Sequence, residues 1–484
     1  MNFKIRKTKT ATNKTAIQVV CYIRRKMEVL KHIGSSDNFF EIKKLEEQAI
    51  NWIGLEINKT GLFKDNKDSY FKNYQYLGFR YSYAYEFLEK IYNKFNFKLT
   101  ILFKDLIIAR ILNPGSKKSS LEFLNTFLDI QHSKNVMYKS ITKYDDKIKD
   151  NTEKEILSIA QKEFCFDFSF VLYDVTTLYF ESFKSNEFKR PGFSKDHKHN
   201  QPQVVIGLVT TKEGFPISYQ IFKGNTFEGN TFLPCILDFK NKHKIGSLTV
   251  VADSAMLSKQ NLDRLKESGL NYIISSRLAN LKESLINKID REITRSDGKS
   301  IRIDNLIVGY SNKRYTKDKA ELFKQIEKAK SKLNTNTEKI TNIKYLKNDK
   351  IKQYLNQELI DKNTKLLGLK GYVTNLKTNN RDIIDYYSGL VKIEHAFRIA
   401  KSDLEARPIY HHKEESIKNH TLICFLALCI SVYLEIKNKR SIGTITEDLK
   451  SITDAKILNK ITGEILIDRV DGCGKVLKLE QMSY

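Results

Sequence analysis

The pattern of apolar and polar positions along the chain changes at Phe168, where a mainly helical region gives way to a strand-rich one. Upstream, apolar residues recur at helical spacing over residues 39–57 and over most of residues 75–165. Two earlier runs, AIQVVCYIRR and KMEVLKHIGSS, have strand character. We therefore predict an N-terminal region, residues 1–165, that starts with a small β-hairpin and continues as helices.

The strand-rich region contains five short apolar runs, which are typical of buried strands. They are SFVLYDVTTLYF, QVVIGLVTT, FPISYQIF, SLTVVADS and LNYIISSR. The second and third runs are joined by Lys212-Glu213-Gly214, which is typical of a hairpin turn. We therefore predict three antiparallel strands followed by two further strands of the same sheet.

Helices are predicted on either side of the fourth strand, at residues 230–242 and 258–268. The second has clear ends, because Ser258 is a good N-cap residue and Gly269 follows its last turn. The order β-β-β-α-β-α-β is that of the ribonuclease-H-like fold. The predicted class is therefore α/β, with a mixed five-stranded sheet.

An interruption separates this core from later helices. Its Lys-rich stretch, residues 313–352, has a net charge of +8, and KDKAELFKQIEKAKSKL within it has helical spacing with i,i+4 charge pairs. That helix is either a solvated surface or faces DNA. Strand character returns at GYVTNL, and helices are predicted at residues 382–404 and 415–438. The predicted domains are residues 1–165, 166–277 with 369–440 (the core), 278–368 (the insertion) and 441–484 (a C-terminal extension).

The net charge of the 484-residue chain is +26, which indicates an acidic partner. Nucleic acid is the usual one, because Lys and Arg release counterions from phosphates; an anionic membrane surface is the competing target. The chain is also rich in Lys, Asn and Ile, so compositional drift accounts for part of the charge. Residues 1–31 carry a further +8, and we expect them and the stretch 313–352 to hold duplex DNA.

Composition also excludes several classes of protein. A hydrophobic content of 41% excludes a disordered tail. The six cysteines, Cys473 among them, form neither a CxxC pair nor a zinc spacing, so we expect reduced thiols in a cytoplasmic protein. The longest apolar run, residues 421–434, is shorter than the roughly 20 residues that span a bilayer, and we expect a buried helix and no membrane partner.

Two aspartates mark the predicted sheet as a candidate site. Asp174 lies in the middle of the first buried strand and Asp253 ends the fourth. An ionised carboxylate on an apolar strand is costly unless another group compensates it, and two of them on one sheet suggest a divalent metal ion. A lone Asp at a strand end is more often a cap or turn residue, so this alternative stays open.

A third acid is available on the helix predicted at residues 382–404. Tyr387, Glu394, Arg398 and Lys401 recur at spacings of 7, 4 and 3, which place them on one face of an α-helix. A face with one acid, two cations and a phenol suits a metal ion together with a phosphate. An exposed charged stripe is the simpler alternative.

The spacing Tyr387-x2-Leu390-x3-Glu394-x6-Lys401 resembles a known motif. It is similar to the Tyr-x2-Arg-x3-Glu-x6-Lys (YREK) motif of DDE transposases from bacterial insertion sequences, with Leu390 in place of the usual Arg. The runs DVTTLYFES, GFSKDHKHNQPQVVIGLV, VVADSAMLSKQN and IEHAFRIAKSDLEARPIYH also look like one subgroup of that family. The resemblance covers roughly residues 15–440.

The resemblance implies a ribonuclease-H-like core in which Asp174, Asp253 and Glu394 are both catalytic and metal-binding. They would hold two Mg²⁺ ions, for which Mn²⁺ can substitute. It also implies DNA contacts from Tyr387, Arg398, Lys392 and Lys401, with Arg398 or Lys392 binding the phosphate that Leu390 cannot bind. The insertion of this group is usually β-rich, and in some relatives an aromatic residue there stacks on a flipped base at a DNA hairpin; Tyr310 or Tyr315 are candidates here.

The implied activity is Mg²⁺-dependent cleavage at the ends of an insertion sequence, followed by strand transfer into target DNA. The partners would be double-stranded terminal inverted repeats and target DNA, bound by a homodimer on paired ends. Two alternatives remain at this stage: a ribonuclease-H-like nuclease without strand transfer, and a catalytically dead DNA-binding relic.

Two other signals point away from additional cofactors. DGKS at residues 297–300 resembles the end of a P-loop, but Ile293 occupies the position of the required first Gly, so no nucleotide cofactor is expected. His197 and His199 could be metal ligands, but a surface loop beside the site is the favoured interpretation.

Overall fold

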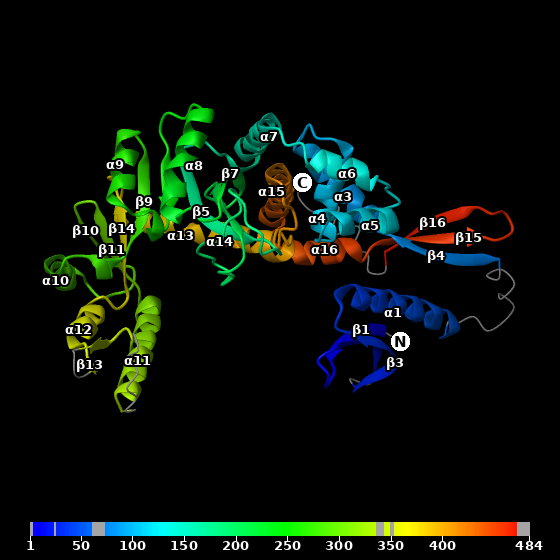
Figure 1. The fold of residues 1–484 in the computed structure, drawn as a ribbon, viewed down its shortest axis with the longest axis horizontal. Helices are drawn as coiled ribbons and strands as arrows, with labels where there is room; N and C mark the ends of the chain where they lie inside the picture. Colours follow the sequence, from blue (N-terminus) through cyan, green and yellow to red (C-terminus); the bar gives the residue numbers. More distant parts are fainter. Residues whose placement is uncertain (1–2, 24–25, 61–72, 335–342, 349–352, 472–484) are drawn as a thin grey trace. The chain divides into compact units, whose positions relative to one another are not determined.

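The structure is a computed structural model that describes residues 3–23, 26–60, 73–334, 343–348 and 353–471 (Figure 1). Cys473, part of the Lys-rich stretch and the last residues of the C-terminal extension lie outside the described residues. The chain divides into two compact units. They are Met1–Gly78 with Lys456–Ile467, and Phe79–Ala455 with Asp468–Tyr484.

The smaller unit is built on an antiparallel sheet covered by one helix. The sheet contains, in spatial order, β1 (Phe3–Lys9), β2 (Thr15–Ile23) and β3 (Lys26–Ser36). Helix α1 (Phe39–Thr60) packs on β2 and β3, with Ile17, Val19 and Ala49 fully buried between the layers. The predicted hairpin is thus observed as β2 and β3, and β1 extends it.

A second three-stranded sheet joins β4 (Tyr74–Arg80), β15 (Thr453–Asn459) and β16 (Ile465–Val470).

Five helices form the first part of the larger unit. They are α3 (Ser82–Lys94), α4 (Ile101–Leu112), α5 (Lys117–Leu128), α6 (Lys134–Ile141) and α7 (Asp146–Phe164). Side-chain caps define three of their starts: Thr100 accepts a hydrogen bond from the N–H of Phe103, Ser116 from Ser119, and Asp145 from Lys147. Helix α4 is apolar on most of its surface because it packs against a second apolar helix, α15 (Glu414–Asn438).

An eight-stranded mixed sheet forms the centre of the larger unit, in the order β10-β11-β14-β9-β8-β5-β6-β7. The five strands predicted from the sequence are adjacent in it; β5 pairs in parallel with β8, and β8 with β9, whereas β6 and β7 are antiparallel. Their bounds are β5 (Phe170–Tyr179), β6 (Gln203–Thr210), β7 (Pro216–Lys223), β8 (Thr249–Ala252) and β9 (Asn271–Ser276). The predicted mixed α/β sheet is therefore confirmed.

The sheet is larger than the predicted five strands, because one strand that follows the insertion and two strands within the insertion extend it. β14 (Leu369–Thr374) pairs with β9, and β11 (Leu306–Tyr310) and β10 (Ser300–Ile303) continue from there. These strands cover the hydrogen-bonding edge that β9 would otherwise expose. The insertion also contains α10 (Glu283–Glu292), α11 (Asn312–Asn334), β12 (Leu346–Asn348), β13 (Gln353–Leu355) and α12 (Gln357–Lys365).

The helix predicted in the Lys-rich stretch is observed as α11. Most of its surface is exposed, but Leu322 and Ala329 are buried against Tyr345 in a small separate core. The helix is therefore amphipathic, and its Lys-rich face is the solvated one.

The remaining helices pack on the sheet or beside it. α8 (Glu228–Lys242) packs on β5, β6 and β7, and α9 (Lys259–Glu267) packs on β9. Ser258 caps α9 by accepting from the N–H of Asn261 at 3.1 Å, as predicted. The last helices of the unit are α13 (Asn380–Ser388), α14 (Leu390–Arg398), α15 and α16 (Ile442–Lys450).

The helix predicted over residues 382–404 is divided into three segments, so the prediction of one regular α-helix is wrong. Gly389 keeps helical dihedral angles, but its N–H bonds to the carbonyl of Tyr386, three residues back, and this ends α13. After α14 the chain continues as a π-helical turn, Ile399–Asp403. The even helical spacing assumed from Tyr387 to Lys401 is therefore interrupted at Gly389 and again after Arg398.

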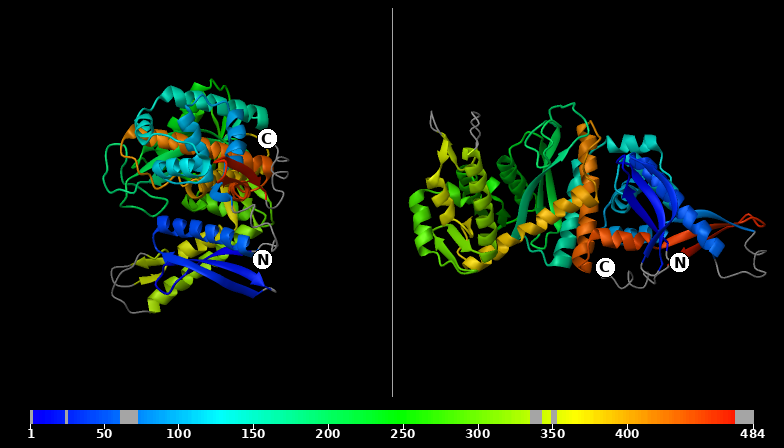
Figure 2. Two further views of the ribbon diagram at one scale, coloured as in Figure 1. Left: turned by 90° about the vertical axis from the view of Figure 1, so that its right-hand side faces the viewer. Right: turned by 90° about the horizontal axis from the view of Figure 1, so that it is seen from below.

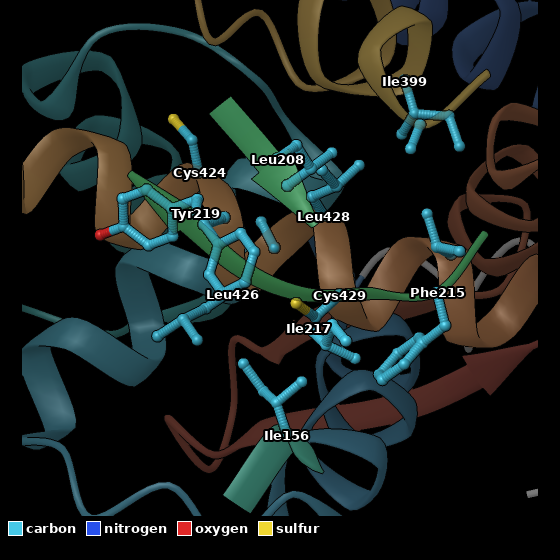
Figure 3. Close-up of a cluster of buried hydrophobic side chains, with 14 of the residues drawn as sticks. Ile156, Leu208, Phe215, Ile217, Tyr219, Ile399, Cys424, Leu426, Leu428 and Cys429 are labelled. Atoms are coloured by element: carbon cyan, nitrogen blue, oxygen red, sulfur yellow. The ribbon is translucent and has the colours of Figure 1, made fainter. Parts of the chain in front are cut away.

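Helix α15 is the centre of the main hydrophobic core. On α15, Cys429 lies beside Ile217 of β7 (Figure 3), and the sheet (green) and α15 (orange) can be followed in two further views (Figure 2). Among the described residues, α15 is the one helix that is both long enough and apolar enough to cross a membrane. However, 89% of its most apolar segment is buried inside the protein. This burial is what the sequence predicted for residues 421–434.

Candidate active site

The register of the parallel strands brings Asp174 and Asp253 to the same level of the sheet. Leu172 of β5 pairs with Val251 of β8, and each aspartate follows two residues later. Side chains two residues apart share a face of a strand, and adjacent strands lie about 4.8 Å apart. β8 ends at Ala252, so Asp253 is the first residue after its strand, whereas Asp174 lies within β5.

Asp253 is held in its ionised form by several donors. Ser275 and Tyr387 each donate a hydroxyl hydrogen bond to its Oδ1, at 3.0 and 3.2 Å. Burial raises the pKa of this carboxyl, but these bonds, the N–H of Ser254 and the nearby Lys370 outweigh burial, and its pKa lies below the usual value. Asp253 is therefore a fixed, oriented anion.

Asp174 has the opposite electrostatic character. Its side chain is only 19% exposed, and burial raises its pKa from 3.8 to about 6. The ammonium of Lys195, 3.8 Å away, and the N–H of Val175, at 2.7 Å, oppose this shift only in part, and the charges of Asp253 and Glu228 add to it. Asp174 therefore carries a charge that its protein neighbours do not fully compensate.

Glu394 completes the group from a third element. It lies on α14, which packs against β5 through buried residues such as Ile393 and Phe397. Gly389, just before α14, also lies against this strand, since a Cβ there would be in ordinary van der Waals contact with Leu172, at 3.5 Å. All three acids line one cavity of about 430 Å³. Its lining is Asp174, Val175, Thr176, Lys195, Asp253, Lys370, Tyr387, Leu390, Glu394 and Phe397.

The four residues expected to contact DNA are placed differently from one another. Tyr387 lines the cavity and bonds to Asp253, as a residue at the centre of the site would. Arg398, Lys392 and Lys401 are not among the described residues that line it. Arg398 bonds to the ring of His395 at 2.6 Å, and Lys392 donates to a backbone carbonyl on the hairpin turn.

Lys401 is held by an acid that the sequence analysis did not single out. Its ammonium donates to both carboxylate oxygens of Asp196, at 3.3 and 3.2 Å, and Arg407 pairs with the same carboxylate at 3.2 Å. The preceding residue of that loop, Lys195, reaches the cavity and also pairs with Glu228 at 3.3 Å. The loop that carries these two adjacent residues thus bonds to α8 through Lys195 and to the π-helical turn through Asp196.

Lys195 and Lys370 are the cavity residues that sequence reasoning missed. Lys195 stands in KDHKHNQP, where only the two histidines drew attention, and Lys370 comes from β14, far along the chain from both aspartates. His197 and His199 are not among the described residues lining the cavity. Tyr310, considered as a base-stacking residue, is only 7% exposed and packs against Tyr315 inside the insertion core.

The donor chemistry of the site suits a hard divalent cation. Asp174, Asp253 and Glu394 offer carboxylate oxygens, and the raised pKa of Asp174 is relieved by an added positive charge. Among the described residues, no three His, Cys, Asp or Glu side chains lie close enough together to form a complete metal site. Mg²⁺ does not require one, because it usually keeps several waters and takes one or two protein carboxylates with substrate phosphates.

We expect Asp174→Asn to stabilise the metal-free protein. Because the pKa of Asp174 is about 6 in the folded state against 3.8 ordinarily, the folded state binds more protons than the unfolded state between these pH values. Stability is therefore lost as pH rises from 4 to 6, up to about 2–3 kcal/mol. Thermal unfolding in EDTA should show the variant ahead of the wild type above pH 6 and level with it near pH 4.

Asp253→Asn is the matched control, with the opposite sign. The lowered pKa of Asp253 means that its ionised form stabilises the fold at neutral pH, and this stability is lost as pH falls through the folded pKa. The variant should therefore be less stable than the wild type at pH 7. Equal effects of the two replacements would contradict the electrostatic difference between the two acids.

Comparison with known proteins gives the site its context. A family model described as "Transposase DDE domain" matches residues 166–430. A cryo-EM structure of a piggyBac transposase synaptic complex with hairpin DNA is similar at a TM-score of 0.37 and 8% identity, over 77% of this chain and 80% of that one. No curated protein matches the sequence. Because the family model covers more than half of the chain and includes all three acids of the cavity, the chain belongs to the transposase DDE domain family.

Proposed function

We propose that this chain is a Mg²⁺-dependent transposase of a bacterial insertion sequence, acting in the cytoplasm, with Asp174, Asp253 and Glu394 as its catalytic acids. The observation that carries the proposal is that these three acids, from β5, the end of β8 and α14, line one cavity. The antiparallel β7-β6-β5 order followed by parallel β8 and β9 supports a ribonuclease-H-like core. The family match supports transposition as the reaction.

The residues of the cavity have distinct roles in this proposal. Asp253, fixed by Ser275 and Tyr387, is ionised in the protein alone and would be a ready ligand for a cation, and a cation bound beside Asp174 would favour the ionised form that burial disfavours. Glu394 is an exposed carboxylate on α14, available to the same ions. When bound, two divalent cations would supply activation of the attacking and leaving oxygens of an in-line phosphoryl substitution.

A lysine of the cavity can take the role of the Arg that the motif usually has. Leu390 lines the cavity where the Arg is usual, and Lys195 and Lys370 line it too. Lys370 lies near Asp253 and Glu394, and burial is the main cause of its lowered pKa. We assign the phosphate-binding role of the usual Arg to Lys370, in place of Arg398 or Lys392.

Duplex DNA is the proposed partner, in the form of terminal inverted repeats and target DNA, bound by a homodimer on paired ends. The net charge of +26 supports a polyanionic partner, and the exposed Lys-rich face of α11 offers one contact surface. The segment of residues 1–31 offers a second. Affinity should therefore fall steeply with salt concentration.

The proposal is tested by incubating the purified protein with a fragment that carries the element's own ends, a target plasmid and Mg²⁺. Joined products are the expected result. Cleaved ends without joined products would contradict the proposal and indicate a nuclease. Retarded but intact DNA would contradict it and indicate a catalytically dead DNA-binding protein. Omitting Mg²⁺ and supplying Mn²⁺ separately tests the metal requirement.

A further inference from the structure

A second cavity, of about 180 Å³, is lined by an unusual number of cationic side chains. It lies in the larger unit between the N-terminus of α5, the end of α4, the segment after the π-helical turn and α15. It shares no described lining residue with the cavity of the three acids. Its cationic and imidazole residues are Arg110, Lys117, Lys118, Arg407, His411 and His420.

Arg110 is buried at this cavity with part of its guanidinium unpaired. It is 2% exposed, and its Nη1 donates to the carbonyls of Leu404 and Glu405, both at 3.2 Å. Its Nε has no hydrogen-bond partner within the part of the chain that the structure describes. A buried donor without a partner costs free energy, and more so when it belongs to a charged group.

Lys117 is buried beside Arg110 without an acid. It is 5% exposed, and its ammonium lies 3.5 Å from Nδ1 of His420. None of the ion pairs found among the described residues includes Lys117. Burial and the charge of Arg110 lower the pKa of Lys117 to about 7. Buried cations are normally paired, so this one lacks its counter-ion.

The pKa values of the two histidines at this cavity are lowered by the same cations. Burial, Lys117 and Arg110 lower the pKa of His411 to about 4, and the same causes hold the pKa of His420 well below its usual range. Glu405 is the one acid among the described lining residues, and it is exposed. Arg407 pairs with Asp196 and Lys118 with Glu122, so the cations of the cavity left without an acid among the described residues are Arg110 and Lys117.

The N-terminus of α5 adds partial positive charge to the same place. Gly115, Ser116, Lys117 and Lys118 line the cavity at the start of this 12-residue helix. The Ser116 side chain already accepts from the N–H of Ser119, so it satisfies only one of the free N–H groups. Helix N-termini favour phosphate and similar anions.

We propose that this cavity is a binding site for a phosphate group, held by Lys117, the unpaired Nε of Arg110 and the start of α5. The phosphate belongs either to a DNA backbone or to free inorganic phosphate, since both present the same oxyanion. The site does not depend on the catalytic role proposed above, because it shares no lining residue with that cavity.

The test is thermal unfolding of the full chain in chloride and in inorganic phosphate at equal ionic strength and pH. Phosphate should raise the midpoint temperature of the wild type by about 3 °C or more at concentrations well above its Kd. Lys117→Met should lose this shift and, in chloride, should unfold at the same or a higher temperature than the wild type. Lys134→Met is the matched control: Lys134 also stands at the start of a helix, α6, but it is exposed and does not line the cavity, so the phosphate shift should persist.

The source of the phosphate is separated by a second measurement. If it is the DNA backbone, Lys117→Met should reduce the slope of log affinity against log salt for a random-sequence duplex by about one. If it is free phosphate, that slope stays unchanged while the thermal shift is still lost. No shift in the wild type, or an equal shift in Lys117→Met, would overturn the site. Should Lys117→Met not fold, Lys117→Gln replaces it, with the same loss of the phosphate shift expected.

Discussion

Glu394→Gln should lower the rate of DNA strand joining by about a thousandfold or more while leaving the fold intact. Metal ions at a phosphoryl-transfer site contribute several kcal/mol to transition-state stabilisation, and each 1.4 kcal/mol is about a factor of ten in rate. Glutamine keeps the size of the side chain but loses the anionic oxygens that hold a hard cation. Because Glu394 is exposed on α14, its replacement should not disturb the core.

The measurement is the yield of joined product against time, with DNA binding followed in parallel by gel retardation. Glu415→Gln is the matched control, because Glu415 is also an exposed acid near the start of a helix but lies outside the cavity. It should join DNA at the wild-type rate. If Glu394→Gln also joined DNA normally, the third acid of the site would have to be another residue.

The candidate acids were predictable because of where they stand in their strands. β5 is apolar along nearly its whole length, so a carboxylate at Asp174 is conspicuous in the sequence alone. Asp253 follows a short strand whose last three residues are apolar. The pairing of Leu172 with Val251 then sets both at one level. The local sequence pattern was enough to indicate these two acids, because a charged side chain within an apolar strand is costly to bury and therefore stands out.

The cations around these acids were not predictable, since they depend on contacts between distant segments. Lys370 reaches the cavity only because β14 returns beside β9 after the insertion, and no periodicity in the sequence indicates that pairing. Lys195 lies in a loop, where neither helical nor strand spacing gives a side chain its direction. Lys401 was placed on one face with Glu394 from regular helical spacing, which the break at Gly389 and the π-helical turn interrupt, and its DNA contact, implied by the family resemblance, stays a prediction.

The insertion shows the same limit. Its Lys-rich helix was predicted from charge pairs four residues apart, which are a local signal. The addition of β10 and β11 to the main sheet was not, because strand order is set by pairing across the chain. The predicted boundary at residue 278 separates segments that share one sheet, and the domain division proposed from the sequence stays a prediction.

Glu153→Ala should destabilise the larger unit by about 3–5 kcal/mol, because Glu153 is a buried acid that pairs with two lysines. It is 1% exposed, and its carboxylate pairs with Lys149 at 2.8 Å and with Lys242. It also accepts from the hydroxyl of Ser218 at 2.9 Å. Alanine would leave both ammonium groups, each less than a fifth exposed, without this partner and would leave Ser218 unpaired.

Asp150→Ala is the matched control for this prediction. Asp150 pairs with the same Lys242, but its side chain is 48% exposed, and exposed pairs contribute less than about 1 kcal/mol. Urea unfolding should be followed by far-UV circular dichroism, because the chain's single tryptophan, Trp52, lies on α1 in the smaller unit and reports on the wrong part of the molecule. If both variants lost similar stability, the burial of Glu153 would not be what makes its ion pairs strong.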